Sequence, residues 1–317
     1  MATPPRLRFG TSSWAYKGWQ GLVYQRDYPK SRFSKDCLAE YADYRPQGRP
    51  LFQTVGIDHT FYRPGTAEQF ARYAAQVPSD FRFCQKVWEE ITIPIYAKHP
   101  RYGPKGGTAN PRFLDVMAFK DLVQTPWQSG LGARAGPCIF EFQRYGLPPS
   151  EFLAKLDTFL GRLPPGPEYG VEVRNPALLG PTYAAILRAH RVAHVYNHWS
   201  IMPPLATQHE KLGRSFSADC VLFRLLTPLG ISHSEAVERY APYSRLQQPL
   251  PQMRMDTTRL ARQALDEGKA VYVLANNRVE GCAPITVQSL VAALAVLPSE
   301  PTHRPADLAP EDEIRSG

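Results

Sequence analysis

The sequence lacks the long apolar runs of a membrane protein. No stretch approaches about 18 consecutive apolar residues, the length that a transmembrane helix needs. The first ten residues, MATPPRLRFG, also lack the apolar segment of a secretory signal peptide. We therefore expect no membrane association and a cytoplasmic location.

Cysteine is scarce, with only five residues in the chain and no C-x-x-C spacing. Four of the five lie in or beside apolar runs, which favours buried reduced thiols over a disulfide or metal-binding role. A reducing cytoplasm suits that pattern. The cysteines are Cys37, Cys84, Cys138, Cys220 and Cys282.

The glycine-rich turns that bind nucleotides are missing as well. No G-x-G-x-x-G or G-x-x-x-x-G-K-[ST] segment follows any expected strand. The sequence therefore carries no motif for a nucleotide cofactor.

Acidic residues are fewer than basic ones, and the formal net charge is +8. The segment from Pro298 onward holds five acidic and two basic residues, so residues 1–297 carry +11. This excess favours an anionic ligand such as a phosphate, a carboxylate or a nucleic acid. The alternative is that the arginines only coat helices and cover apolar surface with their stems.

The sequence does contain eight short apolar runs rich in Val, Phe, Tyr and Leu, which is typical of buried parallel strands. They lie at 7–13, 51–58, 81–87, 137–143, 168–174, 193–199, 220–227 and 270–277. Segments with helical spacing separate most of them, at 34–44, 66–77, 110–127, 150–163, 182–191, 257–268 and 285–294. Eight alternating units predict a single (β/α)8 TIM barrel with a closed, eight-stranded parallel sheet. A doubly wound open sheet is the alternative.

No internal domain boundary is evident. We expect the barrel to span residues 1–297 and the acidic, proline-rich segment 298–317 to be disordered. Two long inserts, 93–110 and 228–252, follow the third and seventh strands, on the side where barrels build their active-site loops. The region 203–217 has no clear pattern.

Five segments in order resemble the YecE-like family, a TIM-barrel family of unknown function that is loosely related to sugar isomerases. They are GTSSWAYKGWQGLVY (10–24), VGIDHTFYR and its continuation to Thr92, LGARAGPCIFEF (131–142), VEVRN (171–175) and VYVLANNRVEGCAPITV (271–287). The chain departs from the family pattern at Gly56, Asp58, Glu141, Asn197 and Leu226, where the family has glutamate, asparagine, glutamine, aspartate and histidine.

Polar residues at the carboxyl ends of the strands should converge on one pocket. Besides the candidates below, they include Ser12, His59, Glu89, Gln143 and Asn197. Glu172 is our candidate acid/base, Asp58 is the second carboxylate, and Lys86 or Arg224 would hold an anionic oxygen. Glu141 would replace, within the same layer, the carboxylate that is missing at Gly56. The alternative is a structural ion-pair layer that joins Lys86, Glu141, Glu172 and Arg224.

Further residues are candidates for substrate binding. Trp14, Tyr16 and Tyr62 would stack on a sugar or a base, whereas Arg174, Arg224, His198, Asn276 and Asn277 would supply polar contacts. A divalent metal held by Asp58, Glu141, Glu172 and His198 is an open alternative, although no local ligand spacing supports it.

Three functions follow from these observations. The favoured one is an enzyme that uses acid/base chemistry on a small polar or anionic substrate, such as a sugar or sugar phosphate. The second is a nucleic-acid binding or processing protein, based on the basic loop 98–105 and the aromatic residues Trp88, Tyr96 and Tyr102. The third is a non-catalytic barrel. The sequence leaves the oligomeric state open, and we favour a monomer.

Overall fold

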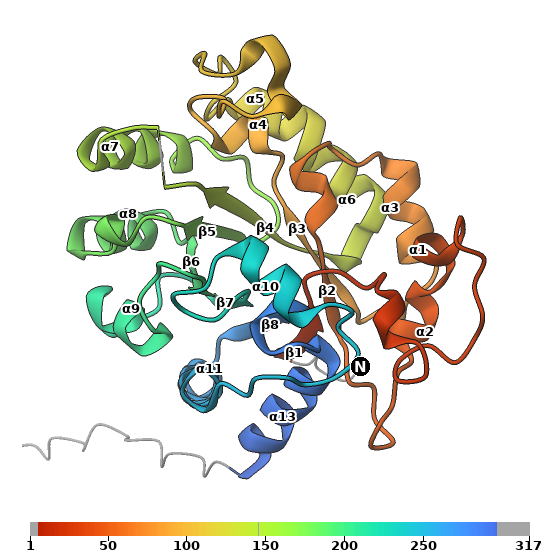
Figure 1. Cartoon of the computed structure of the whole chain (residues 1–317). Coiled ribbons are helices and arrows are strands. Elements are labelled where there is room, and N and C mark those ends of the chain that lie inside the picture. The colour runs from red at the N-terminus through yellow and green to blue at the C-terminus, as the bar shows by residue number, and fades with distance from the viewer. Residues whose placement is uncertain (1–5, 145, 297–317) are drawn as a thin grey trace, which may run out of the picture.

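A computed structural model describes residues 6–144 and 146–296, and it shows a closed barrel of eight parallel strands (Figure 1). Each strand pairs with the next, and β1 pairs with β8 from Leu7–Val271 to Thr11–Ala275, which closes the sheet. The predicted (β/α)8 architecture is confirmed. The strands are β1 (Leu7–Thr11), β2 (Thr54–Ile57), β3 (Arg82–Lys86), β4 (Ala135–Phe142), β5 (Tyr169–Val173), β6 (Ala193–His198), β7 (Cys220–Leu225) and β8 (Ala270–Ala275).

Helices surround the barrel and cover the outer face of the sheet (Figure 1). Trp127 of α6 packs edge-on against Phe70 of α3, with the ring centroids 5.1 Å apart. The helices are α1 (Phe33–Asp36), α2 (Leu38–Ala42), α3 (Ala67–Ala74), α4 (Glu89–Thr92), α5 (Val116–Phe119), α6 (Thr125–Leu131), α7 (Pro149–Leu160), α8 (Pro181–Ala189), α9 (Leu205–Lys211), α10 (His233–Tyr240), α11 (Pro251–Asp266), α12 (Asn277–Glu280) and α13 (Ala283–Val296).

Two predicted helix starts differ from the structure. The segment 34–44 is not one helix, because α1 and α2 meet at Cys37 and Ser34 lies inside α1. The helix expected from Asn110 begins only at Val116, where Asp115 accepts hydrogen bonds from two backbone N–H groups. By contrast, the predicted cap of α3 is confirmed, since Thr66 accepts a hydrogen bond from the Gln69 N–H at 3.2 Å.

Asn110 instead fixes the first long insert. Its side-chain amide donates to the backbone carbonyls of Glu90 at 2.7 Å and Ile93 at 2.8 Å. A bridge between Ile95 and Ala109 then closes the insert on itself. The 93–110 segment is therefore tied to the carboxyl end of β3.

The second insert and the unclear region both contain helices. Helix α10 lies within 228–252, and α9 lies within 203–217. Figure 1 shows α10 near the end of the barrel formed by β7 and β8. The two inserts thus add walls at the carboxyl-end face.

A second apolar cluster includes Cys84, Ile139, Leu222 and Tyr272, and the buried Arg8 guanidinium lies 5.4 Å from the centre of the Tyr272 ring. All five cysteines are buried and free, as predicted. None of the helices in residues 6–144 and 146–296 has the length and hydrophobicity of a transmembrane segment. The predicted tail at 298–317 lies outside the described residues.

Candidate functional site

A layer of charged side chains lies inside the barrel. Arg224 of β7 is 2% exposed and contacts three carboxylates. Its guanidinium donates to Glu172 at 2.6 Å, to Glu141 at 3.1 Å and to Asp58 at 2.9 Å. Glu141 and Glu172 face the same way because they are register partners on β4 and β5.

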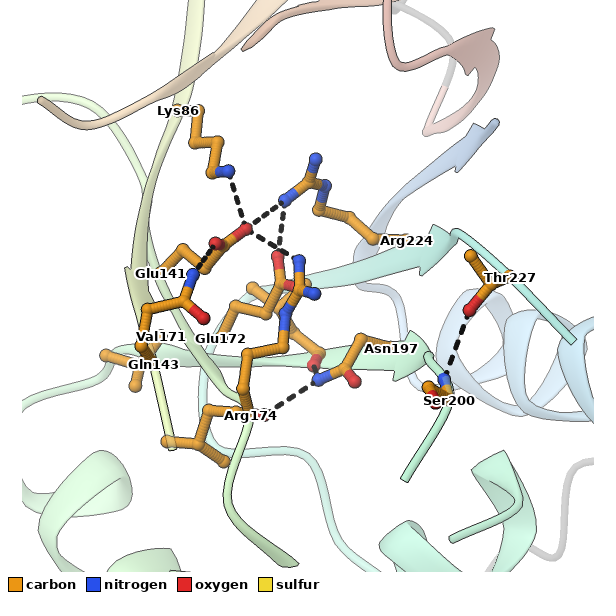
Figure 2. A network of polar contacts seen from close by, with 12 residues as sticks. Lys86, Glu141, Gln143, Val171, Glu172, Arg174, Asn197, Ser200, Arg224 and Thr227 are labelled. Atoms are coloured by element: carbon orange, nitrogen blue, oxygen red, sulfur yellow. Dashed lines mark hydrogen bonds and ion pairs between the residues drawn. The ribbon is translucent and has the colours of Figure 1, made fainter. Parts of the chain in front are cut away.

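Arg174 and Lys86 complete this ion-pair layer (Figure 2). Arg174 donates to Glu172 and to Glu141, both at 2.7 Å, and the Lys86 ammonium lies 2.8 Å from Glu141. Three cations therefore meet three carboxylates, counting Asp58. Burial alone would raise the pKa of Glu141, but Arg174, Lys86 and Arg224 outweigh it and hold that pKa well below its usual value.

This geometry matches the structural alternative stated for Lys86, Glu141, Glu172 and Arg224. Glu172 is fully buried beneath Arg174 and Arg224, and both of its oxygens are paired. It does not line the cavity described below. Glu172 thus lies beneath the cavity with both carboxylate oxygens paired, and its acid/base role remains a prediction.

The strand-two position Gly56 has no room for a side chain. A Cβ there would lie 2.9 Å from the backbone oxygen of Ser12. Glu141 thus supplies a carboxylate to this layer from the strand β4 side. Asp58, two residues after Gly56, reaches Arg224 from β2.

A cavity of about 800 Å³ opens above the ion-pair layer at the carboxyl ends of the strands. Charged and aromatic side chains from both the strand ends and the inserts line it. Those expected from the sequence are Tyr16, Asp58, Tyr62, Lys86, Glu141, Arg174, Arg224 and Asn276.

Three predicted binding residues do not reach this cavity. Trp14 is buried, donates to the Ser34 carbonyl at 3.1 Å and packs on Tyr73. The Nδ1 atom of His198 lies 2.8 Å from the Thr227 carbonyl oxygen. Buried Asn277 accepts a hydrogen bond from the Trp19 indole at 3.1 Å. The Trp14 indole N–H, the His198 Nδ1 atom and the Asn277 Oδ1 atom thus have partners inside the protein, and none of the three residues lines the cavity.

The proposed metal ligands do not form a metal site. Glu141 and Glu172 are paired with guanidinium groups, and His198 faces a backbone carbonyl. In the part of the chain that the structure describes, no group of three or more His, Cys, Asp or Glu side chains is arranged to hold a metal ion. Asp58, Glu141, Glu172 and His198 therefore do not fit a divalent cation as a set.

Glu89 is a third carboxyl of the cavity, and the sequence placed it at a strand end without indicating a role. It begins α4, three residues after the last residue of β3, and accepts a hydrogen bond from the Tyr102 hydroxyl at 2.8 Å. Arg101 of the 93–110 insert also pairs with it. Burial raises the pKa of Glu89, and the contacts with Tyr102 and Arg101 only partly oppose this effect. Local sequence could not show this, because the partners come from the insert.

Arg278, His233 and Trp199 also line the cavity and were missed. Arg278 directly follows the predicted pair Asn276 and Asn277, so its position after β8 could have identified it as a cavity residue. His233 is the first residue of α10 within the second insert, 228–252, for which the sequence predicted no helix. The Arg174 guanidinium lies 4.0 Å above the Trp199 ring, which fixes both side chains against the cavity.

Two basic side chains of the loop 98–105 are paired with carboxylates. Arg101 pairs with Glu89, and the Lys105 ammonium lies 3.7 Å from Glu90. Tyr96 is buried, and Tyr102 donates to Glu89. These contacts reduce the charge and the aromatic surface that this loop offers to a nucleic acid.

Solved structures with the same architecture support the fold. The chain resembles a DUF72 family protein from Enterococcus faecalis V583 with a TM-score of 0.58 and 16% identity, over 92% of this chain and 98% of that one. It also resembles a DUF72 family protein from Thermotoga maritima MSB8, with a TM-score of 0.51 and 18% identity, over 91% of this chain and 99% of that one. No curated protein matches the chain.

The family match is found in the sequence itself and covers residues 8–309. The family is described as protein of unknown function DUF72. The resemblance to the YecE-like family is consistent with this match. Because the match spans nearly the whole barrel, this chain belongs to the DUF72 family.

Proposed function

We propose that the protein is an enzyme that binds a small, polar, anionic substrate in the 800 Å³ cavity and acts on it by acid/base chemistry. The observation that carries this proposal is the charge balance of the cavity. Among the described residues, five cations line it, whereas three carboxylates line it and Glu172 lies directly beneath. The five cations are Lys86, Arg101, Arg174, Arg224 and Arg278.

One positive charge therefore remains after all pairs are counted. The ion-pair layer is balanced, and Arg101 is balanced by Glu89. The remaining cation is Arg278. A cavity with walls of low dielectric concentrates such a field, so it favours an anion over a neutral ligand.

The aromatic walls favour a compact ring or a short carbon chain over an extended polymer. Tyr16 lines one part of the cavity, Tyr62 another, and the Trp199 ring a third. Aromatic faces pack well on the apolar faces of sugars while polar groups bond their hydroxyls. A sugar, a sugar acid or a sugar phosphate satisfies both requirements.

Glu89 replaces Glu172 as the candidate acid/base residue. It lines the cavity, and its raised pKa brings it closer to neutral pH than an ordinary carboxyl. Tyr102 and Arg101 orient it. Glu141 is a poor candidate, because its lowered pKa makes it a weak base.

The test is a thermal-shift screen of sugars, sugar acids, sugar phosphates and short oligonucleotides, followed by ¹H NMR of each stabilising compound with the protein. We expect a small anion to stabilise the protein and to be chemically converted or to exchange protons with solvent. Glu89→Gln should bind the same compound with turnover reduced by about 10²-fold or more. The nearby Glu90→Gln is the matched control, because Glu90 does not line the cavity.

Two results would contradict the proposed function, and a third would contradict only the role of Glu89. Stabilisation by oligonucleotides alone, lost with added salt, would favour the nucleic-acid alternative. Binding of a small anion without conversion by wild type would favour a non-catalytic binding barrel. Wild-type turnover in Glu89→Gln would remove Glu89 from the chemistry.

A further inference from the structure

We propose that Arg278, His233 and Tyr16 form a subsite for a phosphate group, so that the ligand is a phosphate monoester of a small polar molecule. This inference rests on the proposed function and names the anionic group of its substrate. All three side chains line the cavity, and they come from the loops that follow β8, β7 and β1.

Arg278 differs from the other four cations of the cavity. Lys86, Arg101, Arg174 and Arg224 each pair with a carboxylate. Within the described part of the chain, Arg278 has no ion-pair partner, and its Nε atom is buried without a hydrogen bond. The guanidinium of Arg278 lines the cavity with its charge uncompensated by a carboxylate, so a bound anion would supply the missing partner.

His233 and Tyr16 add donors beside Arg278. Burial, together with Arg278, Arg174 and Lys86, lowers the pKa of His233, so its imidazole is neutral at pH 7 and has one N–H to donate. Burial raises the pKa of Tyr16 to about 12 against the effect of Arg278, so the phenol keeps its proton. The Arg278 guanidinium, the His233 imidazole and the Tyr16 phenol thus each offer at least one N–H or O–H donor to the cavity.

This donor set suits phosphate better than carboxylate. A phosphate monoester has three terminal oxygens and a charge near −2, and the guanidinium matches two of the oxygens as a fork. Arg278 supplies the one uncompensated charge, and His233 can take up a proton when a dianion binds. Barrels of this class often bind phosphate at the loops after strands seven and eight, where Arg278 and His233 lie.

The experiment is calorimetric titration with inorganic phosphate at constant ionic strength, on wild type, Arg278→Gln and Arg191→Gln. Arg191 is 75% exposed at its side chain and pairs with Asp219, so Arg191→Gln removes the same charge away from the cavity. We expect Arg278→Gln to weaken phosphate binding by at least about tenfold and Arg191→Gln to leave it unchanged. Arg278→Gln should fold, because it removes an unpaired charge.

Equal weakening by both variants would mean that phosphate responds only to net charge, and the subsite would be rejected. Unchanged binding in Arg278→Gln, or no phosphate binding by wild type, would also reject it. A second titration compares ribose 5-phosphate with ribose. We expect the phosphorylated compound to bind more tightly to wild type by at least about tenfold, and this preference should disappear in Arg278→Gln.

Titration with gluconate, a small anion that has no phosphate group, distinguishes failure of the phosphate subsite from failure of the proposed function. If calorimetry shows that wild type binds gluconate but not phosphate, the subsite is wrong while a small-anion cavity stands. If phosphate binds through Arg278 but no phosphorylated compound is converted, the subsite stands and the acid/base proposal fails.

Discussion

Arg224 joins Asp58, Glu141 and Glu172, so replacing it by methionine removes the centre of the ion-pair layer while keeping much of the side-chain volume. Three carboxylates would then face only two cations, Lys86 and Arg174. Breaking a buried pair on one side costs about 3–5 kcal/mol because a charge is left uncompensated.

The structure indicates a value at the lower end of this range. Glu172 would keep Arg174, and Glu141 would keep Arg174 and Lys86. Asp58 is one-third exposed at its side chain, so water can replace part of its lost contact. We therefore expect Arg224→Met to lower the free energy of unfolding by about 3 kcal/mol at pH 7.

Urea unfolding followed by far-UV circular dichroism measures this loss of stability. The same measurement at several pH values tests whether the loss depends on ionised carboxylates. In wild type the pKa of Glu141 is depressed below 4.5, so its stabilisation is present above pH 4.5 and is lost as pH falls through the folded-state pKa. Removing Arg224 reduces that depression. The difference between wild type and Arg224→Met should therefore be full at pH 7 and should narrow below pH 4.5.

Two further variants make the prediction refutable. Adding Glu172→Gln to Arg224→Met restores the charge balance and should recover about 1–2 kcal/mol. Arg191→Met breaks an ion pair whose side chains are both mostly exposed, and it should cost less than about 1 kcal/mol. The prediction is refuted if Arg224→Met lowers the free energy of unfolding no more than Arg191→Met does. It is also refuted if Glu172→Gln, added to Arg224→Met, destabilises the protein further.

Three other predictions concern packing and buried polar groups. Gly56→Ala should lower the free energy of unfolding by about 1–3 kcal/mol in urea, because its Cβ would lie 2.9 Å from the Ser12 oxygen; an unchanged midpoint would mean that β1 can shift freely. Burial lowers the pKa of His194 from 6.5 to about 4, so wild-type stability should fall between pH 6.5 and 4; urea midpoints for His194→Gln should show a smaller fall over that range. Asn277→Leu leaves the Trp19 indole N–H without its acceptor and should lower thermal stability by about 1–3 kcal/mol, whereas an equal melting temperature would argue against that contact.

The periodic parts of the fold could be predicted from the sequence. Each strand is a short β-branched or aromatic run, and burial on both faces makes such runs continuous. Helix boundaries were less predictable where local signals compete. Asn110 followed by proline is a typical helix start, but the amide is used to hold the carbonyls of Glu90 and Ile93.

The sequence predicted many of the residues that line the cavity, but not which of them are already paired. Strand-end positions identified Lys86, Glu141, Arg174 and Arg224, because parallel strands bring their carboxyl ends to one face. How deeply each side chain is buried could not be predicted from the strand-end positions. Glu172 shares a face with these residues, yet it lies beneath the guanidinium groups that cover it.

The sequence by itself determined the barrel, the face that carries the polar side chains and the excess of positive charge. These properties depend on local periodicity and on composition, and both can be read directly from the sequence. Only the tertiary structure decided which cations are already paired, that Glu89 and not Glu172 faces the cavity, and that Arg278 has no carboxylate partner among the described residues. Pairing depends on distances of a few ångströms between segments far apart in sequence, and neither spacing nor composition contains those distances.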